Sequence, residues 1–222
     1  MLKKYRLLKR NVRKEIPAVI ELLVATTNPG KFAEVQAFLS RLPLRMRSVR
    51  DLESPPAVVE DGATFEANAL KKARALADFS GLLTLADDSG LEVDALGGAP
   101  GIYSARYCGE EGNDDENNRR LLRELAGVAK AKRTGRFVCA LALCAPDASV
   151  MSDWSVRESC EGLIAFELKG ANGFGYDPLF FYPPFGKTFG EIDRQTKATV
   201  SHRGKALKKL AQALPKLVDL AG

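Results

Sequence analysis

The chain has 222 residues, 45% of them hydrophobic, and is long enough to bury a full core as one domain or one two-lobed unit. It contains no apolar run approaching the roughly 20 residues that span a bilayer, which argues against a membrane protein. The formal net charge is +5, but residues 1–16 carry seven basic side chains against Glu15 alone. The remaining chain is therefore close to neutral, at −1, and lacks the charge of a nucleic-acid-binding domain.

The basic segment at the start of the chain is expected to be a disordered extension over residues 1–17, ahead of one domain over residues 18–222. Contact with nucleic acid or an anionic surface is the alternative role for this segment. It has neither the apolar centre of a secretory signal nor the serine content of a transit peptide. The four cysteines lack Cys-x-x-Cys spacing and the chain has one histidine, so we expect a reduced, cytoplasmic protein without structural zinc.

From residue 20 onward, strands and helices are expected to alternate along the chain. The expected strands are residues 20–25, 82–86, 137–144 and 150–168. The expected helices are residues 31–39, 64–77, 113–126 and 201–217. Thr64 is a suitable N-cap for the second helix, and the leucines of the last one recur at helical spacing. This alternation predicts an α/β fold with a mixed sheet.

Two adjacent carboxylates, Asp87 and Asp88, stand at the end of the strand expected at residues 82–86. Successive side chains of a strand point to opposite faces, so one carboxylate can face a cleft and hold a divalent cation while the other supports it. Asp-Asp-Ser-Gly is also composed entirely of turn formers, so a surface turn is the alternative. The pair indicates metal-assisted chemistry on a phosphate.

Two loops offer further polar groups. Residues 26–31 read Thr-Thr-Asn-Pro-Gly-Lys between the first strand and helix, where backbone N–H groups and Lys31 can bind an anion. The loop is not a Walker A motif, because Ala25 and Phe32 occupy its Gly and Ser/Thr positions. Glu60 precedes the second helix and can share a cation with Asp88. An ordinary strand-to-helix turn and a solvated acidic loop are the alternatives.

Two later segments have the residue types of a ligand site. Residues 172–179 place two glycines around two aromatic rings, which suits stacking against a flat ligand, although a hairpin tip with inward aromatics has the same pattern. Lys197, His202 and Arg203 converge on the start of the last helix, where cations repel one another and oppose the helix dipole. We interpret this cluster as the site of an anionic ligand, which would offset the repulsion.

Together these segments resemble the inosine triphosphate pyrophosphatase family, the non-standard purine NTP pyrophosphatases. The resemblance covers roughly residues 20–215 and rests on five motifs that occur in the family's order and spacing. The motifs are residues 26–31, 86–91, 98–107, 173–178 and 201–204. Each motif alone is unspecific, and their shared register carries the resemblance.

The resemblance implies a two-lobed, mixed-sheet α/β fold with the active site in the cleft between the lobes. It further implies a homodimer that hydrolyses ITP, dITP and XTP to the monophosphate and pyrophosphate using Mg²⁺, with no membrane or nucleic-acid partner. Glu60 and Asp88 would ligate the metal, and Asp88 would also be the catalytic base. The implied substrate-binding residues are Thr26, Thr27, Asn28, Pro29, Gly30, Lys31, Ser89, Phe174, Gly175, Tyr176, Asp177, Lys197, His202 and Arg203.

Selection of the base would follow from hydrogen bonding. Hypoxanthine and xanthine present a 6-oxo acceptor where adenine presents a 6-amino donor, so a pocket that donates there is left with an unpaired donor against ATP. Guanine shares the 6-oxo group and must be rejected at its 2-amino group. Three other functions fit parts of the sequence: a nucleotide sensor without turnover, a nucleic-acid-binding protein that uses the basic extension, and a general NTP phosphatase that releases orthophosphate.

Overall fold

The computed structural model describes residues 20–110, 112–147 and 151–219, so the extension expected at residues 1–17 lies outside the described residues. One seven-stranded sheet has the order β2-β1-β3-β4-β5-β6-β7. Its strands are β1 (Ile20–Ala25), β2 (Leu44–Ser48), β3 (Leu83–Val93), β4 (Thr134–Cys144), β5 (Trp154–Ile164), β6 (Phe180–Tyr182) and β7 (Lys187–Thr188). The α-helices are α1 (Pro29–Leu39), α2 (Phe65–Ser80), α3 (Asp114–Glu124), α4 (Arg194–Val200) and α5 (His202–Asp219). Within these ranges, no helix combines the length and the apolar character needed to cross a membrane.

The sheet is mixed, as the sequence predicts. β1 pairs in parallel with both β2 and β3, whereas β3, β4, β5, β6 and β7 pair antiparallel to one another. In the parallel pair, Ala25 at the end of β1 lies opposite Ala86 of β3. The loop that follows β1 therefore leaves the sheet beside Asp87 and Asp88.

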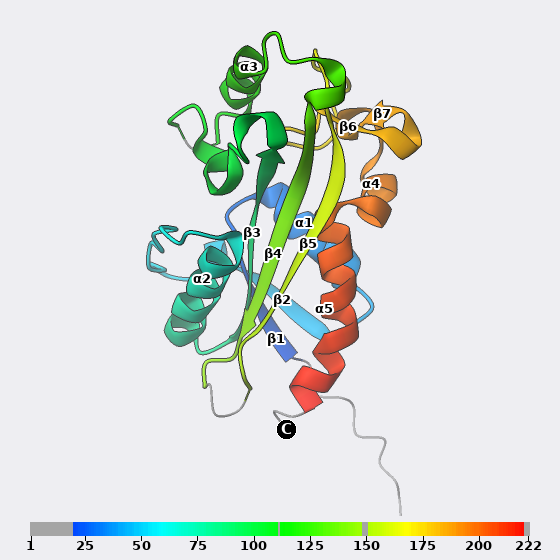
Figure 1. Cartoon of the computed structure of the whole chain (residues 1–222). Coiled ribbons are helices and arrows are strands. Elements are labelled where there is room, and N and C mark those ends of the chain that lie inside the picture. Colours follow the sequence, from blue (N-terminus) through cyan, green and yellow to red (C-terminus); the bar gives the residue numbers. More distant parts are fainter. Residues whose placement is uncertain (1–19, 111, 148–150, 220–222) are drawn as a thin grey trace, which may run out of the picture.

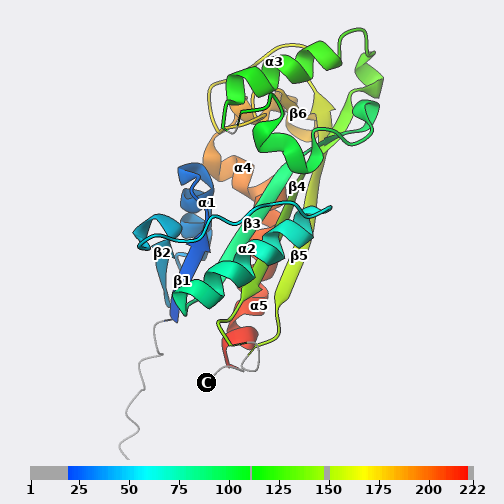
Figure 2. The ribbon, with the colours of Figure 1, turned by 90° about the vertical axis from the view of Figure 1, so that its left-hand side faces the viewer.

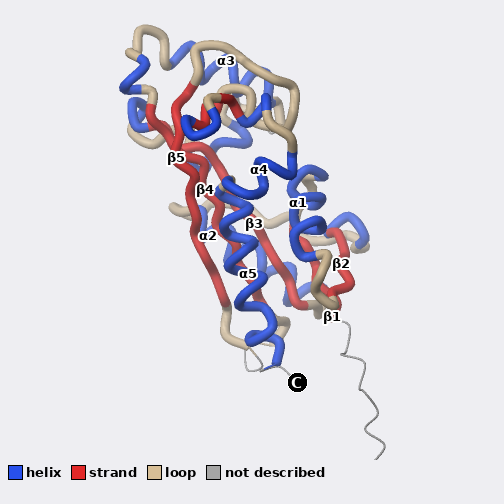
Figure 3. The backbone as a smooth tube through the Cα atoms, turned by 90° about the vertical axis from the view of Figure 1, so that its right-hand side faces the viewer, coloured by secondary structure: helices blue, strands red, loops and turns tan. Residues whose placement is uncertain are grey.

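Helices cover both faces of the sheet. Alternate residues of β1 bury themselves on opposite sides: Leu22 packs with α1 and α5, and Leu23 packs with α2. Figure 2 shows α2 in front of the long strands, and Figure 3 shows α5 along their other face with α1 beside β1 and β2. This arrangement gives the lower part of the molecule two apolar layers.

The long strands β3, β4 and β5 continue beyond these helices into an upper part that contains α3, β6 and β7 (Figure 1). A third apolar cluster fills this upper part, with Phe180 and Phe189 fully buried at its centre. β3 thus carries its polar residues across the junction of the two parts, beside the loop after β1 and the start of α5.

Several expectations from the sequence need correction. Asp87 and Asp88 lie in the middle of β3, because the strand continues to Val93, so both the strand end and the surface turn are wrong. The strand continues because the whole segment pairs with the apolar strand β4, with Gly90 opposite Val138. The fourth expected strand is shorter, at Trp154–Ile164, and the sequence did not indicate β2, β6, β7 or α4.

Candidate active site

The two adjacent aspartates of β3 are buried and face opposite sides of the sheet, as strand alternation predicts. Asp87 is 4% exposed and Asp88 is 7% exposed. Asp87 points to the α1 and α5 side, where its carboxylate contacts Lys31 Nζ at 2.5 Å and Arg203 Nε at 2.9 Å. Asp88 points to the α2 side, where its buried Oδ2 has no hydrogen-bond partner among the described residues. The two neighbours thus have opposite electrostatic environments.

Asp87 is held ionised. Although burial alone would raise it, the pKa of Asp87 lies well below its ordinary value because Arg203 and Lys31 stabilise the carboxylate. Ser89 Oγ also donates to Asp87 Oδ1 at 2.8 Å. Asp87 therefore fixes the two cations rather than accepting a proton.

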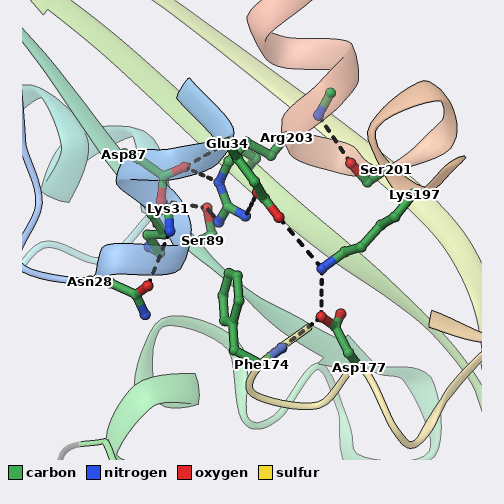
Figure 4. A network of polar contacts seen from close by, with 12 residues as sticks. Asn28, Lys31, Glu34, Asp87, Ser89, Phe174, Asp177, Lys197, Ser201 and Arg203 are labelled. Carbon is green, nitrogen blue, oxygen red and sulfur yellow. Dashed lines mark hydrogen bonds and ion pairs between the residues drawn. The ribbon is translucent and has the colours of Figure 1, made fainter. Parts of the chain in front are cut away.

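The cations that converge on the start of α5 are balanced by carboxylates of the protein itself (Figure 4). Lys197 Nζ lies 2.5 Å from Asp177 Oδ2, and Arg203 Nη1 lies 2.7 Å from Glu34 Oε2. Together with the Asp87 pairs, three cations face three carboxylates within one buried cluster. The repulsion inferred from the sequence is therefore offset internally, so the argument that it requires an anionic ligand is wrong.

His202 begins α5 as a buried, neutral side chain. Its ring stacks on Phe137 with centroids 4.8 Å apart, and its Nδ1 is buried without a hydrogen-bond partner among the described residues. Burial lowers the pKa of His202 well below its ordinary value, and the nearby cations Arg203 and Lys197 lower it further. Ser201 caps the helix, since its Oγ accepts from the Gly204 N–H at 3.1 Å.

The Phe174 ring lies over the same cluster. Its centroid is 4.9 Å from Lys197 Nζ, and Figure 4 shows the ring pointing toward Arg203 and Glu34. The ring also meets the start of α1 so closely that a Cβ on Gly30 would come within 2.8 Å of it. Glycine at position 30 is therefore what lets the loop after β1 and the Phe174 loop approach each other.

Two cavities adjoin at β3. The smaller, of about 110 Å³, is bounded by Phe174, Phe137 and His202 together with the Lys197 and Arg203 cations. The larger, of about 990 Å³, contains Asp88, Glu60 and Lys72. Asn28, Lys31 and Ser89 line both cavities, so the two form one continuous site.

The larger cavity combines carboxylates and cations. Burial raises the pKa of Asp88 to about 6, the negative charge of Glu60 adds to this effect, and the Lys72 cation opposes it. Lys72 Nζ lies 2.6 Å from Glu60 Oε1. Arg50 and Arg106 reach into the cavity lining and donate to the backbone carbonyls of Thr27 and Glu60, at 2.5 Å and 3.3 Å.

These residues fit a magnesium ion. The described residues contain no group of three or more His, Cys, Asp or Glu side chains that could enclose a metal by themselves. Magnesium, however, keeps several waters and is commonly held by one or two carboxylates together with substrate phosphates. The buried Asp88 Oδ2 without a partner, beside the Glu60 carboxylate, is such a donor set.

The structure brings the predicted site residues together. Thr26, Thr27, Asn28, Lys31, Glu60, Asp88 and Ser89 line the larger cavity, and Phe174, Gly175, Tyr176, Asp177, Lys197, His202 and Arg203 line the smaller one. Pro29 and Gly30 border a third hollow, which Phe174 also lines. Tyr176 is largely a core residue, 4% exposed, whose hydroxyl donates to the Ser104 carbonyl at 2.9 Å.

Sequence reasoning did not single out Glu34, Arg50, Lys72 or Arg106 as residues of this site. Glu34 lies one helical turn after Lys31 on α1, a spacing that the sequence offered but that looks like an ordinary surface pattern. Lys72 lies on α2, where its side chain likewise looks like part of an ordinary helix surface. Only the tertiary fold shows that these helical faces point into the site.

Fold and site together define an α/β protein with two adjoining cavities, a small one beside the Phe174 ring and a large one lined by carboxylates and cations, an arrangement that suits the base and the phosphates of a nucleotide. Residues 22–213 match the model of the Ham1 family. The chain is 50% identical over 195 residues to the dITP/XTP pyrophosphatase of Exiguobacterium sibiricum, covering 88% of this chain and 97% of that protein. It is 48% identical over 198 residues to the dITP/XTP pyrophosphatase of Desulforamulus reducens, covering 89% and 97%.

A solved structure agrees with these sequence matches. The Ham1 protein from Coxiella burnetii superposes with a TM-score of 0.80 at 38% identity, covering 89% of this chain and 99% of that chain. The chain belongs to the Ham1 family. The family resemblance stated from the sequence motifs is thereby confirmed.

Proposed function

We propose that the protein hydrolyses the non-standard purine nucleoside triphosphates ITP, dITP and XTP to the monophosphate and pyrophosphate, and so removes deaminated purines from the nucleotide pool. The observation that carries this proposal is the pairing of a small, charge-balanced cavity under Phe174 with a large cavity that contains Asp88 and several cations. The names of the two relatives, dITP/XTP pyrophosphatase, support the same substrates.

The small cavity suits a neutral purine base. Phe174 offers a ring face for stacking, and Lys197 and Arg203 offer N–H donors whose charges are already balanced by carboxylates. A 6-oxo purine accepts from such donors, whereas the 6-amino group of adenine leaves one unpaired at a cost of roughly 1–3 kcal/mol. Rejection of ATP then needs more than one such contact.

The large cavity suits the triphosphate. Lys31, in the first turn of α1, lies at its edge, and Lys72, Arg50 and Arg106 contribute further cations. Glu60 and Asp88 would hold Mg²⁺ there. A bound magnesium ion neutralises charge that develops on the phosphate oxygens during displacement.

In this proposal Asp88 activates the attacking water. Its carboxylate can accept a proton as the water oxygen forms a bond to the α-phosphorus and the bond to the bridging oxygen of the β-phosphate breaks. Pyrophosphate leaves with the electron pair of that bond. In the metal-free protein, a pKa of about 6 leaves the Asp88 carboxyl mostly ionised at neutral pH.

The proposal includes the assembly and the location. The catalytic unit is residues 18–222, it forms a homodimer, and it acts in the cytoplasm. The four free cysteines, Cys108, Cys139, Cys144 and Cys160, support a reducing compartment. Size-exclusion chromatography with light scattering tests the dimer, and a monomer at micromolar concentration would contradict it.

The deciding experiment incubates the protein and Mg²⁺ with ITP, XTP, GTP or ATP and measures phosphate with and without added inorganic pyrophosphatase. Signal that requires the coupling enzyme and arises mainly from ITP and XTP supports the proposal. Phosphate without the coupling enzyme would identify a general NTP phosphatase. No product from any nucleotide, with binding retained, would identify a sensor.

A further inference from the structure

Two side chains of helix α3 form hydrogen bonds with the loop that carries Phe174. The Gly175 N–H donates to Asp114 Oδ2 at 2.6 Å, and Asn118 Nδ2 donates to the Gly175 carbonyl at 2.9 Å. Asp114 and Asn118 lie one turn apart on α3, at the top of the molecule in Figure 2. The two peptide groups that flank Gly175 are therefore both bonded to the same helix.

These two hydrogen bonds fix the backbone next to the aromatic ring. Gly175 has a φ of +60°, a conformation in which the chain turns sharply after Phe174. On the other side of Phe174, its own N–H donates to Asp177 Oδ2 at 2.9 Å, the oxygen that also contacts Lys197. With both neighbouring peptides held, the ring has little freedom to leave its place over the cations.

The side-chain amide of Asn118 is oriented by hydrogen bonds and not only by packing. Its Nδ2 also donates to the Asp114 carbonyl at 2.9 Å, while its Oδ1 is buried without a partner among the described residues. Turning the amide over would place Oδ1 against two carbonyl oxygens, so this orientation is the better of two imperfect ones. A buried oxygen without a partner costs free energy, which an apolar side chain at this position would avoid.

Asp114 also stands where the two parts of the site meet. It lines both the smaller cavity under Phe174 and the larger cavity that contains Asp88. Replacing its carboxylate would therefore affect the smaller cavity through the Gly175 N–H, while Asp88 and Glu60 in the larger cavity would keep their own contacts.

We propose that Asp114 and Asn118 are positioning residues that hold Phe174 in place and thereby set the affinity and selectivity for the purine base. This inference rests on the proposed function for its kinetic consequences. The hydrogen bonds from α3 to Gly175 are a property of the free protein and can be tested without a substrate.

The first test compares Asp114→Ala with Asp115→Ala. Asp115 is the next residue of the same helical turn and is exposed, so Asp115→Ala removes the same charge from the same helix end. A hydrogen bond from a backbone N–H to a carboxylate has a strength that converts to roughly tenfold or more in an equilibrium constant. Asp114→Ala should therefore raise KM for ITP roughly tenfold, leave kcat within about twofold, and lower the preference for ITP over GTP.

Asp115→Ala should match the wild type in all three quantities, and Asp114→Asn, which keeps an acceptor oxygen, should restore most of the lost affinity. A KM and an ITP-to-GTP preference that stay at wild-type values in Asp114→Ala would overturn the proposal. An equal loss in Asp115→Ala would also overturn it, because it would show a general charge effect.

The second test measures amide hydrogen exchange over residues 173–177 in the nucleotide-free protein. Exchange in this segment should be faster in Asp114→Ala than in Asp115→Ala, while β3 and β4 remain equally protected in both. Unchanged exchange in the segment would refute the proposal that Asp114 holds the Phe174 loop, whether or not the enzyme is active. A wild-type protein that releases no pyrophosphate would refute the proposed function instead, and the exchange result would still decide whether Asp114 holds the loop.

Discussion

Neutralising Asp88 of β3 should raise the free energy of unfolding, whereas neutralising its neighbour Asp87 should lower it. Asp88 is a buried carboxylate whose pKa is raised from an ordinary 3.8 to about 6 by burial and by Glu60. The folded protein therefore holds the Asp88 proton more tightly than the unfolded chain does. Above pH 6 this difference destabilises the metal-free protein by about 3 kcal/mol, at 1.36 kcal/mol per pKa unit.

Asp88→Asn removes that penalty, so the metal-free variant should be more stable than the wild type at pH 8 although it lacks the proposed base and metal ligand. For a protein of this size, about 3 kcal/mol corresponds to a rise in melting temperature of roughly 6 to 12 °C. The gain should shrink as the pH falls from 6 toward 3.8, because the wild-type carboxyl is then protonated in the folded state.

Asp87→Asn should do the reverse. The substitution leaves Lys31 and Arg203 without their shared carboxylate, at a cost of about 3 kcal/mol for a buried pair. The pKa of Asp87 is lowered in the fold by Arg203 and Lys31 against the effect of burial, so its stabilisation is present above pH 3.8 and is lost as the pH falls below that value. Near pH 4, Asp87→Asn should thus still be less stable than the wild type, while Asp88→Asn should match it.

Thermal unfolding in EDTA at pH 8 and pH 4, together with the coupled pyrophosphate assay, measures both effects. Asp88→Asn should show no turnover and a higher melting temperature at pH 8. A melting temperature below that of the wild type at pH 8 would refute the electrostatic reasoning, and wild-type turnover would refute the role of Asp88 as base.

Three further changes test the rest of the site. EDTA should abolish pyrophosphate release and Mg²⁺ should restore it, since Asp88 and Glu60 would act through the metal; activity that survives chelation contradicts this assignment. Lys72→Met should raise the pKa of Asp88 in the metal-free protein, measured by NMR titration of its carboxyl carbon, because the Lys72 cation lowers that pKa, whereas Lys71→Met, which removes an exposed pair with Asp61, should leave it unchanged. Gly30→Ala should raise KM for ITP with little change in kcat, because the new Cβ would lie 2.8 Å from the Phe174 ring; an unchanged KM would show that the ring adjusts freely.

The opposite facing of Asp87 and Asp88 was predictable from the sequence because strand alternation is a local rule. The length of β3 was not, since Asp-Asp-Ser-Gly has the composition of a turn and becomes a strand only through its pairing with β4. Strands of two or three residues, such as β6 and β7, carry too few side chains to show a period.

The ion pairs around Arg203 could not be predicted either. Its partner Glu34 lies 169 residues earlier in the chain, on a helix whose polar residues look like an ordinary solvent-facing surface. Without that contact, Lys197 and Arg203 look like unbalanced cations in the sequence, a pattern that predicts an anionic ligand. Which charges cancel is a property of tertiary structure, even where the charged residues themselves are evident.

That cancellation determines how a nucleotide can enter the site. If Lys197 and Arg203 were unpaired, their positive charge would attract a triphosphate to the Phe174 cavity. Because Glu34 and Asp177 balance them, the cavity offers hydrogen-bond donors without a net field. The larger cavity is lined by four cations and four carboxylates, so its protein charges are also even: Lys31, Arg50, Lys72 and Arg106 with Glu60, Asp87, Asp88 and Asp114. We infer that a divalent cation beside Asp88 would tip this balance toward the phosphates, which makes the orientation of the bound nucleotide, and not only its cleavage, depend on the metal.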